Sequence, residues 1–451
     1  MENSMEEELF YIIMVINMVK QSIWLNEDLD SNFPYLDSDI ETDVLIIGGG
    51  IVGVLCAYEL QKRNINYILV EKEKIGRKTT KDTTAFLTIQ HETLYQDLIK
   101  NFGILKARQY LELNSKALKK FKDLSKIYDF DYEEYSSSLF SSINEKTIYQ
   151  EYKALEKLNC NTSLIKDLPL DIEIKLGVSV INQAIINPYK LITSISKELN
   201  IYEFTKIKKL YKNKAITNND KVIRFKSVII ATHYPFKNIS NLTFMKLTQR
   251  RSYVCSIKAD RKISGSYCSI DTDGLYFRQY KDSIIIGGND RNTGTNNKND
   301  FIEKIEKLNI GEITNIWSGQ DCITLDGIPY IGKYSIFYPN HYIATGFNFW
   351  GFTWAMASSF ILADMIEWNQ EYKLVSPSRI SINKNLYNNI KTSLKNLLTF
   401  KTPRCKHLGC KLVYNKDEKT WECPCHGSRY NINGKLLDGP TKKNMQSIRK
   451  K

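Results

Sequence analysis

The sequence predicts a mixed fold, in which an α/β nucleotide-binding domain is interleaved with an antiparallel β domain and followed by a small metal-binding module. Three observations lead to it. A strand, a glycine-rich turn, a helix and a second strand follow one another over residues 41–71. Short apolar runs at 226–232 and 342–346 return the chain to that unit after long intervals. Four cysteines and two histidines lie close together in residues 405–426.

Composition supports a globular protein. The 451 residues are 42% hydrophobic and 25% charged, which excludes disordered and fibrous classes. No apolar run reaches the 18 residues or so of a transmembrane helix, and Leu9–Met18 is too short and follows an acidic start without the features of a secretory signal. We therefore expect a cytoplasmic protein with an N-terminal extension over 1–40, which leaves Met18 as an alternative start.

Positive charge gathers at the carboxyl end. The formal net charge is +13, and the segment from Lys401 onward holds 13 basic and 4 acidic side chains, a net of +9. Such a patch suits nucleic acid, an anionic membrane or an acidic protein. No nucleic-acid motif accompanies it, so we expect no nucleic-acid partner, and a general compositional bias toward lysine stays open as the alternative.

The turn after the first strand carries a dinucleotide-binding pattern. Gly48, Gly50 and Gly53 have G-x-G-x-x-G spacing after the apolar run 43–48, and Glu71 ends the next apolar run. The first glycine permits the tight turn, the second lets backbone approach a pyrophosphate, and the third brings helix against strand. The helix terminus would hold the anion, and Glu71 would accept hydrogen bonds from a ribose. This predicts a Rossmann-type domain.

Two later features favour FAD over NAD. A hydroxyl-rich loop follows Glu71, and its candidate cofactor contacts are Thr79, Thr80, Thr83 and Thr84. The run 342–346 ends at Gly346 and leads into an apolar helix over 354–368, so a second helix terminus faces the same domain. FAD is long enough to use all of these segments.

Six stretches resemble the FAD-dependent amine and D-amino-acid oxidases, the glycine-oxidase-like flavoproteins, and more closely the bacterial subgroup fused to a carboxy-terminal Rieske domain. They are QSIWL at 21–25, ETDVLIIGGGIVG at 41–53, TTKDTTA at 79–85, ATHYPF at 231–236, LDGIPYIG at 325–332 and ATGFNFWGFT at 344–353. The resemblance implies an FAD-binding domain in three parts, a substrate domain in two, a helical linker and a Rieske module. The FAD-binding domain is expected to comprise residues 41–110, 201–239 and 336–372, and the substrate domain residues 111–200 and 240–335. The helical linker is expected over 373–404 and the Rieske module over 405–451.

The carboxy-terminal boxes C-x-H-x-G-C and C-P-C-H-G-S resemble those of Rieske [2Fe–2S] centres, in which two thiolates bind one iron and two imidazoles the other. Carried over by position, the ligands are Cys405, His407, Cys423 and His426. The resemblance also implies a disulfide between Cys410 and Cys425, hydroxyl donors Ser428 and Tyr430, and a covering loop at Gly439–Pro440. The other five cysteines lie apart from one another. A structural zinc site is the alternative.

The module departs from a complete Rieske domain. An amphipathic helix is expected over 383–400, which leaves no room for strands before Cys405. A unit of about 45 residues is too small for its own core, so cluster and disulfide must hold it together, and we expect it to lean on the flavoprotein body.

The substrate pocket also departs from the family. Amino-acid oxidases carry an Arg a few residues before the DG-x-P-x-IG stretch that clamps the substrate carboxylate, whereas this chain has Asp321 and no Arg there. Asp321 would repel a carboxylate, which favours an amine or polyamine derivative over an α-amino acid. Arg251 and Arg278 are possible substitutes or structural pairs. The candidate catalytic residues are His91, Tyr253, Tyr276, Arg278 and Asp321.

The resemblance therefore implies a dehydrogenase of a C–N bond in an amine or amino acid. Electrons would pass from FAD through the cluster to an acidic one-electron carrier such as a flavodoxin-like protein, docked on the +9 segment. The alternative is a flavin amine oxidase in which the Rieske module is a redox sensor or a structural element.

Overall fold

The structure is a computed structural model that describes residues 19–27, 29–236, 242–295, 300–379, 381–399 and 403–445. The expected extension before Met18 lies outside these ranges. Among the described helices, none combines the length and apolarity needed to cross a bilayer.

The first sheet has eight strands and a central parallel set, as expected for a nucleotide-binding domain. Strand β1 pairs in parallel with β2 on one side and β10 on the other, and β10 pairs in parallel with β17. Buried aliphatic residues fill these strands, the pattern of a parallel sheet covered on both faces. The strands are β1 Ile40–Ile47, β2 Tyr67–Val70, β7 Ile201–Tyr202, β8 Ile207–Leu210, β9 Lys214–Thr217, β10 Val222–Ile230, β16 Tyr330–Ser335 and β17 Tyr338–Thr345.

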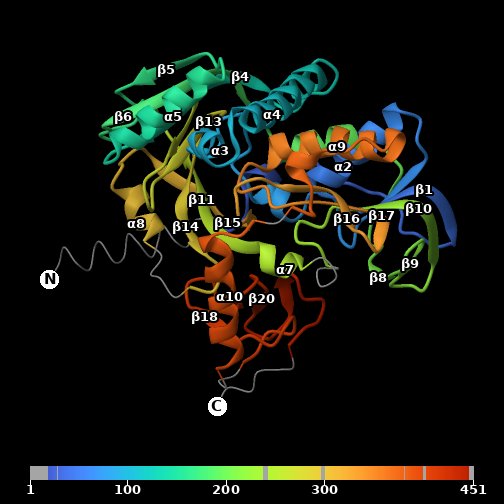
Figure 1. Cartoon of the computed structure of the whole chain (residues 1–451). Helices are drawn as coiled ribbons and strands as arrows, with labels where there is room; N and C mark the ends of the chain where they lie inside the picture. The colour runs from blue at the N-terminus through green and yellow to red at the C-terminus, as the bar shows by residue number, and fades with distance from the viewer. Residues whose placement is uncertain are drawn as a thin grey trace.

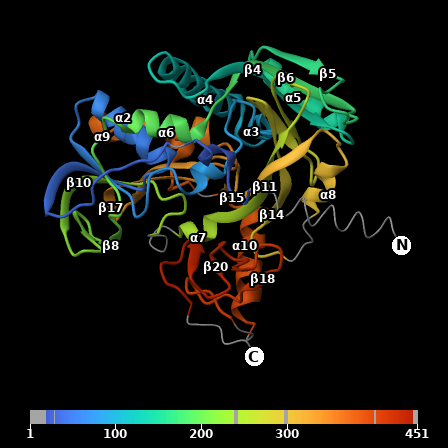
Figure 2. The ribbon, with the colours of Figure 1, turned by 180° about the vertical axis from the view of Figure 1, so that it is seen from behind.

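Two long apolar helices lie side by side on this sheet, α2 (Ile51–Lys62) and α9 (Gly351–Trp368), with α6 (Pro188–Ser196) beside α2 (Figures 1 and 2). Both α2 and α9 are buried along most of their length. They begin after β1 and β17, at the carboxyl edge of the parallel strands, where ligands bind in folds of this type. The cofactor segments that are far apart in sequence therefore meet at one edge.

The second sheet is the larger and has nine strands, which are mostly antiparallel. Strands β11, β14 and β15 form its lower part in Figure 1, and helices α3, α4 and α5 lie over its other end. Its strands are β3 Phe86–Leu87, β4 Glu133–Ser141, β5 Thr162–Ile165, β6 Leu176–Ile185, β11 Leu247–Lys258, β12 Ser266–Ser269, β13 Tyr276–Tyr280, β14 Ser283–Asn292 and β15 Glu312–Thr324. The helices are α3 Leu94–Phe102, α4 Ile104–Ser125, α5 Glu145–Lys157, α7 Thr243–Lys246 and α8 Phe301–Glu306, with 3-10 turns η1 Ile23–Leu25, η2 Thr79–Asp82 and η3 Lys373–Val375.

The predicted fold class is confirmed, but the sheets divide the chain differently from the expected ranges at two places. Strand β16 (330–335) pairs with β17 in the first sheet, although it falls within the range 240–335 expected for the substrate domain. Strand β3 (86–87) joins the second sheet through β6, although it falls within 41–110. Pairing with a distant strand, rather than local sequence, assigns each of these strands to its sheet.

The carboxy-terminal module is a four-stranded antiparallel sheet below the second sheet (Figure 1). Its strands are β18 Val413–Asn415, β19 Thr420–Glu422, β20 Arg429–Asn431 and β21 Leu436–Asp438, and helix α10 (Lys384–Leu397) precedes it. Among the residues described, the buried core of the module consists of four cysteines with Leu412, Tyr430 and Met445, and three partly buried side chains pack against it. Such a core is very small, and the module has additional contacts with the larger body.

These contacts come from one face of β11 and β15. Arg251 of β11 is 1% exposed and makes an ion pair with Glu418, which lies between β18 and β19, at 3.1 Å from Nε to Oε1. Glu418 also accepts a hydrogen bond from the Tyr253 hydroxyl at 2.8 Å and pairs with Arg429. The two arginines, after the opposing effect of burial, hold the pKa of Glu418 at about 2. The module is thus joined to the sheet by a buried ion-pair network.

Glu418→Gln tests the importance of this network. The substitution removes the nearer of the two carboxylates that pair with the buried guanidinium of Arg251 and leaves only Glu422 at 3.9 Å, so the free energy of unfolding of the module is expected to fall by about 3 kcal/mol. Loss of the cluster's visible absorbance during a denaturant titration would measure it. Glu156→Gln removes an exposed partner of Lys153 and is the control, with an expected cost below about 1 kcal/mol. Equal effects of the two variants would contradict a stabilising role for the network.

Candidate functional site

Glycines shape the turn between β1 and α2. Gly48 has φ +114°, in the region that favours glycine, and a Cβ there would lie 2.5 Å from the Ala231 carbonyl oxygen. A Cβ on Gly53 would lie 1.9 Å from the Gly48 carbonyl oxygen. No side chain fits at either position, so the backbone amides at the start of α2 stay open to a pyrophosphate.

The acid and the hydroxyls expected to contact the nucleotide lie around this turn. The Glu71 carboxylate accepts hydrogen bonds from the Gly49 and Glu73 N–H groups at 2.7 and 3.0 Å. The Thr80 hydroxyl accepts the N–H of Ile51, the first residue of α2, at 3.1 Å. An oxygen ligand at the start of α2 is what a phosphate would also supply.

The remaining cofactor candidates occupy the edge between the two sheets. Thr79 lies on η2, and the Thr83 hydroxyl donates to the Thr80 carbonyl at 3.3 Å. Thr84 lines a small cavity at this edge. Gly346 follows β17 with φ +75°, and a Cβ there would clash with Thr324. A Cβ on Gly50 would lie 3.4 Å from the Thr80 hydroxyl oxygen. Together, these residues fit an elongated dinucleotide.

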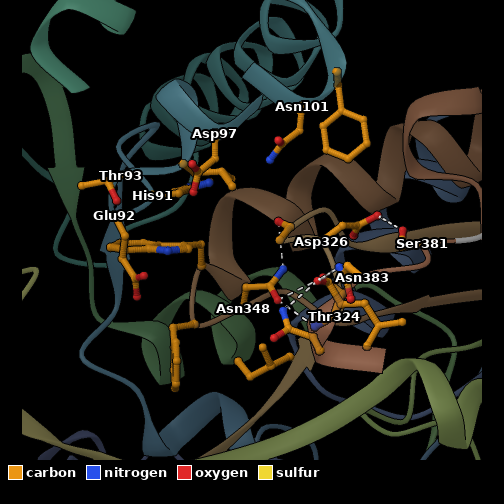
Figure 3. Close-up of a pocket in the computed structure, with 18 of the residues that line it drawn as sticks. His91, Glu92, Thr93, Asp97, Asn101, Thr324, Asp326, Asn348, Ser381 and Asn383 are labelled. Atoms are coloured by element: carbon orange, nitrogen blue, oxygen red, sulfur yellow. Dashed lines mark hydrogen bonds between the residues drawn. The ribbon is translucent and has the colours of Figure 1, made fainter. Parts of the chain in front are cut away.

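Two neighbouring cavities lie along the second sheet. The smaller, of about 70 Å³, lies among residues 82–86, β11, β13 and β15. The larger, of about 700 Å³, opens beyond it and is lined by polar side chains from α3, β15 and the segment 381–385 (Figure 3). Both are lined by Glu92, Phe349 and Trp350. The larger cavity therefore provides an approach to the smaller one.

Carboxyl groups dominate the polar lining of the smaller cavity. Asp321 is there, and with it Asp82, Glu92 and Asp290. Burial raises the pKa of Asp290 to about 7, Arg250 opposes this shift, and Glu92 and Asp321 add to it. Burial also raises the pKa of Asp321. The Oδ1 atom of Asp290 is buried and has no hydrogen-bond partner, so it is available to a ligand.

Aromatic rings complete the walls. Tyr276 packs edge-on against Phe86 at 6.4 Å between ring centroids, and burial raises the pKa of its hydroxyl well above the usual range. Phe349, Trp350 and Phe352 line the same cavity. Ring faces and carboxylates attract a cation, whereas they offer nothing to a carboxylate.

Of the predicted catalytic residues, Tyr276 and Asp321 line the smaller cavity and the other three do not. Tyr253 faces the carboxy-terminal module, where it donates to Glu418. Arg278 is buried under the Trp24 ring and donates to the Ile186 carbonyl oxygen at 2.7 Å. His91 lies in the wall of the larger cavity, but both ring nitrogens have partners, the Tyr110 hydroxyl at 2.7 Å and the Thr88 carbonyl oxygen at 2.8 Å. Burial lowers the pKa of His91 to about 3, so the ring is neutral.

Sequence reasoning missed Asp290 and Glu92. Glu92 adjoins His91, and its φ of +50° is unusual for glutamate, but that angle cannot be read from sequence. Asp290 lies on β14, and only the pairing of β14 between β11 and β13 places it at the cavity. Neither residue belongs to a motif.

The expected cluster ligands converge between the two loops of the module. The imidazole rings of His407 and His426 are 5.0 Å apart and perpendicular, and Nδ1 of His426 is buried without a hydrogen-bond partner. The Cys405 and Cys423 thiols share a hydrogen bond, which lowers the pKa of Cys405 against the opposing effect of burial and raises the pKa of Cys423, so the two sulfurs lie close enough together to bind one metal.

The supporting residues lie around these ligands. The Tyr430 hydroxyl is 3.7 Å from the Cys405 sulfur and accepts the Lys406 N–H at 3.0 Å. Apart from its contact with Cys405, the buried Ser428 oxygen has no hydrogen-bond partner, which suits donation to a cluster sulfide. Pro440 is buried, and a Cβ on Gly439 would lie 2.5 Å from Cα of Ser428, so this loop covers the site closely.

Cys410 and Cys425 are joined as a disulfide between the two loops. The sulfurs of Cys410, Cys423 and Cys425 lie within 4.8 Å of one another. Because two of them are bonded together, they are not available as thiolates, and Cys423 remains with Cys405 for a metal. Two cysteines and two histidines with orphaned buried donors around them fit a Rieske cluster, and the glycine cradle fits FAD.

Comparisons with known proteins agree with this geometry. The family model described as FAD dependent oxidoreductase matches residues 43–365, and the Rieske [2Fe-2S] domain model matches 390–449, beginning within α10. The chain is 30% identical to YhfW of Bacillus subtilis (strain 168), named as a Rieske 2Fe-2S iron-sulfur protein, over 95% of this chain and 97% of that protein.

Solved structures resemble the body of the molecule. L-proline dehydrogenase from P. horikoshii has a TM-score of 0.64 with 22% identity, covering 76% of this chain and 98% of that one. Glycine oxidase from Geobacillus kaustophilus has a TM-score of 0.63 with 15% identity, covering 76% and 99%. At these identities the likeness concerns the fold. The two family matches decide the assignment: the chain belongs to the DAO family of FAD-dependent oxidoreductases and carries a C-terminal Rieske [2Fe–2S] domain.

Proposed function

We propose that the protein is a dehydrogenase of the C–N bond of a cationic amine that carries no carboxylate next to the nitrogen. The carboxyl groups at the smaller cavity are the observation that carries this proposal. Asp321 lies in the stretch in which the family resemblance led us to expect a carboxylate-binding arginine, and Asp290 and Glu92 lie at the same cavity. Among the described residues, no arginine lines the smaller cavity, and Arg250 lines the larger one, where it stacks over Phe349 at 5.4 Å.

Asp290 is the proton acceptor in this proposal. An amine must lose its ammonium proton before the adjacent carbon can give up a hydride. With a pKa of about 7, the Asp290 carboxylate is basic enough to take that proton near neutral pH. Its buried, unpartnered Oδ1 is the receiving atom. Asp321 and the aromatic walls would hold the cation in place, which makes them binding groups rather than proton carriers.

When bound, FAD would supply a two-electron acceptor and the Rieske cluster a one-electron acceptor. The fold of the chain keeps the cavity and the cluster loops close to each other. Side chains alternate along a strand: Asp321 of β15 faces the cavity, whereas Gln320 donates to the Gly427 carbonyl oxygen at 3.1 Å, next to His426. On β11, Ser252 and Val254 line the cavity, whereas Arg251 and Tyr253 contact the module. A single sheet layer between the two sites supports an electron relay.

Electrons that reach the cluster need a one-electron carrier, and the +9 segment favours an acidic one. The competing hypothesis, a Rieske module that senses redox state or only supports the fold, makes a different prediction. Under it, anaerobic substrate would bleach the flavin while the cluster stayed oxidised over many turnovers. Electron paramagnetic resonance distinguishes the two.

Matched pairs of compounds test the substrate class. Putrescine and ornithine differ by one carboxylate, as do dimethylamine and sarcosine. We expect anaerobic flavin bleaching with at least one of the amines and none with its carboxylated counterpart. Asp321→Asn should raise the amine concentration for half-maximal bleaching about tenfold, which corresponds to about 1.4 kcal/mol. Asp282→Asn, at an exposed position, is the control. A preference for the carboxylated member of each pair would exclude the proposed class.

The pKa of Asp290 predicts a pH profile. Its folded-state value of about 7 lies above the ordinary 3.8, so the basic form is lost below pH 7 and present above it. kcat/KM for the amine should therefore rise as pH increases through about 7, and Asp290→Asn should remove that limb. Two substrates with different amine pKa values provide the control. If the pH at which kcat/KM rises shifts with the pKa of the substrate, the titrating group is the substrate amine, and Asp290 is not the proton acceptor.

Gln320→Leu tests the relay. Loss of the hydrogen bond to Gly427 loosens the cluster loop against β15, and cluster reduction after anaerobic flavin reduction should slow about tenfold, the scale of supporting contacts at metal sites. The rate of flavin bleaching by substrate should not change. Rapid-freeze electron paramagnetic resonance measures the first and stopped-flow absorbance the second. Gln279→Leu, in β13 of the same sheet and bonded to the Ile263 N–H, is the control. Unchanged cluster reduction in Gln320→Leu would argue against this contact.

A further inference from the structure

Helix α10 exposes a row of large apolar side chains, which we call the α10 stripe: Tyr387, Ile390, Leu394 and Leu398. Tyr387 is 64% exposed, Leu394 53% and Leu398 71%. The residues are three, four and four positions apart, so they lie on one side of the helix. None of the residues of α10 is buried. Contiguous apolar surface of this kind marks an interaction site.

The opposite side of α10 is anchored to the rest of the chain. Asn383 and Asn385 donate to the Leu325 carbonyl oxygen at 2.6 and 3.0 Å, and Asn389 donates to the Met245 carbonyl oxygen at 3.4 Å. Leu397 packs against the cysteine core of the module. The helix is therefore held in one orientation, which leaves the stripe facing outward.

Lysines flank the stripe along one edge. Lys384, Lys391 and Lys395 are exposed, and α10 contains no acidic residue. The pattern is an apolar centre with a positive edge, which is complementary to an acidic protein surface with an apolar centre.

The stripe ends at the loop that carries a cluster ligand. Arg404 donates to the Leu397 and Thr399 carbonyl oxygens at 2.9 and 2.6 Å, and the Lys411 N–H donates to the Asn396 carbonyl oxygen at 3.0 Å. Cys405 and His407 lie between these two anchors. A partner docked on the stripe would thus lie next to the loop of His407.

The two histidines differ in their surroundings. His426 is 3% exposed, and Phe244 of α7 lies against its ring at 5.8 Å between centroids. His407 is only half-buried, and its neighbour Lys406 is exposed. His426 is thus the ligand directed at the flavoprotein body and His407 the ligand nearer to solvent.

We propose that the α10 stripe with its lysine edge is the docking surface for an acidic one-electron carrier protein, which receives electrons on the His407 side of the module. The inference rests on the proposed relay and identifies where the carrier binds. Carrier complexes of this kind have small interfaces, and attraction between opposite charges speeds their formation.

The test uses the full-length protein loaded with both cofactors and an acidic c-type cytochrome as the carrier probe. Titrating the protein anaerobically with dithionite, one electron at a time and without excess, until the cluster is reduced makes the measurement independent of substrate and leaves no dithionite to reduce the cytochrome directly. We expect rapid cytochrome reduction that slows steeply with added salt. Lys391→Glu with Lys395→Glu should slow it about tenfold and abolish the salt dependence. Tyr387→Ser with Leu394→Ser should weaken cytochrome binding and leave the salt dependence in place.

Lys208→Glu, at an exposed position on β8 of the first sheet, is the matched control and should leave the rate unchanged. Anaerobic bleaching of the flavin by substrate should be normal in every variant. Equal cytochrome reduction in all variants would overturn the docking proposal. Vesicles of equal parts phosphatidylglycerol and phosphatidylcholine provide a second test. If the protein binds them, and the stripe variants lose this binding but keep normal cytochrome rates, the docking proposal is also overturned, because the occupant would then be a membrane.

A dimer in sedimentation that the stripe variants dissociate would likewise overturn the proposal in favour of a second copy of the chain. Failure of the relay gives a different result. In that case substrate would not reduce the cluster in the unmodified protein, yet the dithionite-reduced protein would still pass electrons to the cytochrome with the predicted dependence on Lys391 and Lys395.

Discussion

The alternation of side chains along β11 and β15 is the constraint on which the arrangement of this molecule depends. Successive residues point to opposite faces of a sheet. Asp321 therefore lines the cavity while its neighbour Gln320 contacts the module, and the backbone of β15 lies between the two sites. The same is true of Ser252 and Arg251. A shift of one residue in the pairing of β11 with β15 would exchange these faces and put the buried arginine into the cavity. The register between β11 and β15 thus determines which side chains line the cavity and which contact the module.

The carboxy-terminal module depends on this sheet. Its core is mainly cysteine, and a group of that size cannot by itself offset the conformational entropy of the strands around it. Metal ligation and the disulfide supply part of the stabilisation. The Arg251–Glu418 ion pair and the Gln320–Gly427 hydrogen bond supply contacts from outside. Because those contacts are buried and directional, they also fix which histidine faces inward.

Local patterns were sufficient for the parts of the protein that are built from consecutive residues. The glycine turn and the acid at the end of β2 lie within about 30 residues, and their spacing predicts a dinucleotide site. The two cysteine boxes are equally compact, but their assignment as cluster ligands came from the resemblance to Rieske centres. The disulfide implied by the family resemblance is present. The expected helix before Cys405 is α10, and it ends within three residues of the expected boundary at Phe400. Whether the apolar residues of α10 are exposed, by contrast, depends on which other segments pack against the helix.

Residues placed by distant strand pairing could not be ranked from sequence. Tyr253 and Tyr276 are both tyrosines on strands of the second sheet, yet one contacts the module and the other the cavity. Arg251 and Arg250 are neighbours with opposite directions, and only the register decides between them. Asp290 belongs to no motif and reaches the cavity because β14 pairs between β11 and β13. Choosing among the candidate catalytic residues therefore required the sheet topology.

The carboxyl groups at the cavity also say something about the ligand. A buried polar atom without a partner costs about 1–3 kcal/mol, and Asp290 has such an atom. Neighbouring carboxyls add repulsion whenever two of them ionise, which is why burial and these neighbours together raise the pKa of Asp290. A structural role would be served better by uncharged residues of similar size, since they avoid both costs. A cationic ligand removes both at once, by pairing with the carboxylates and filling the space between the rings. The balance of these costs therefore supports the proposed cationic substrate over a purely structural role for the cluster of acids.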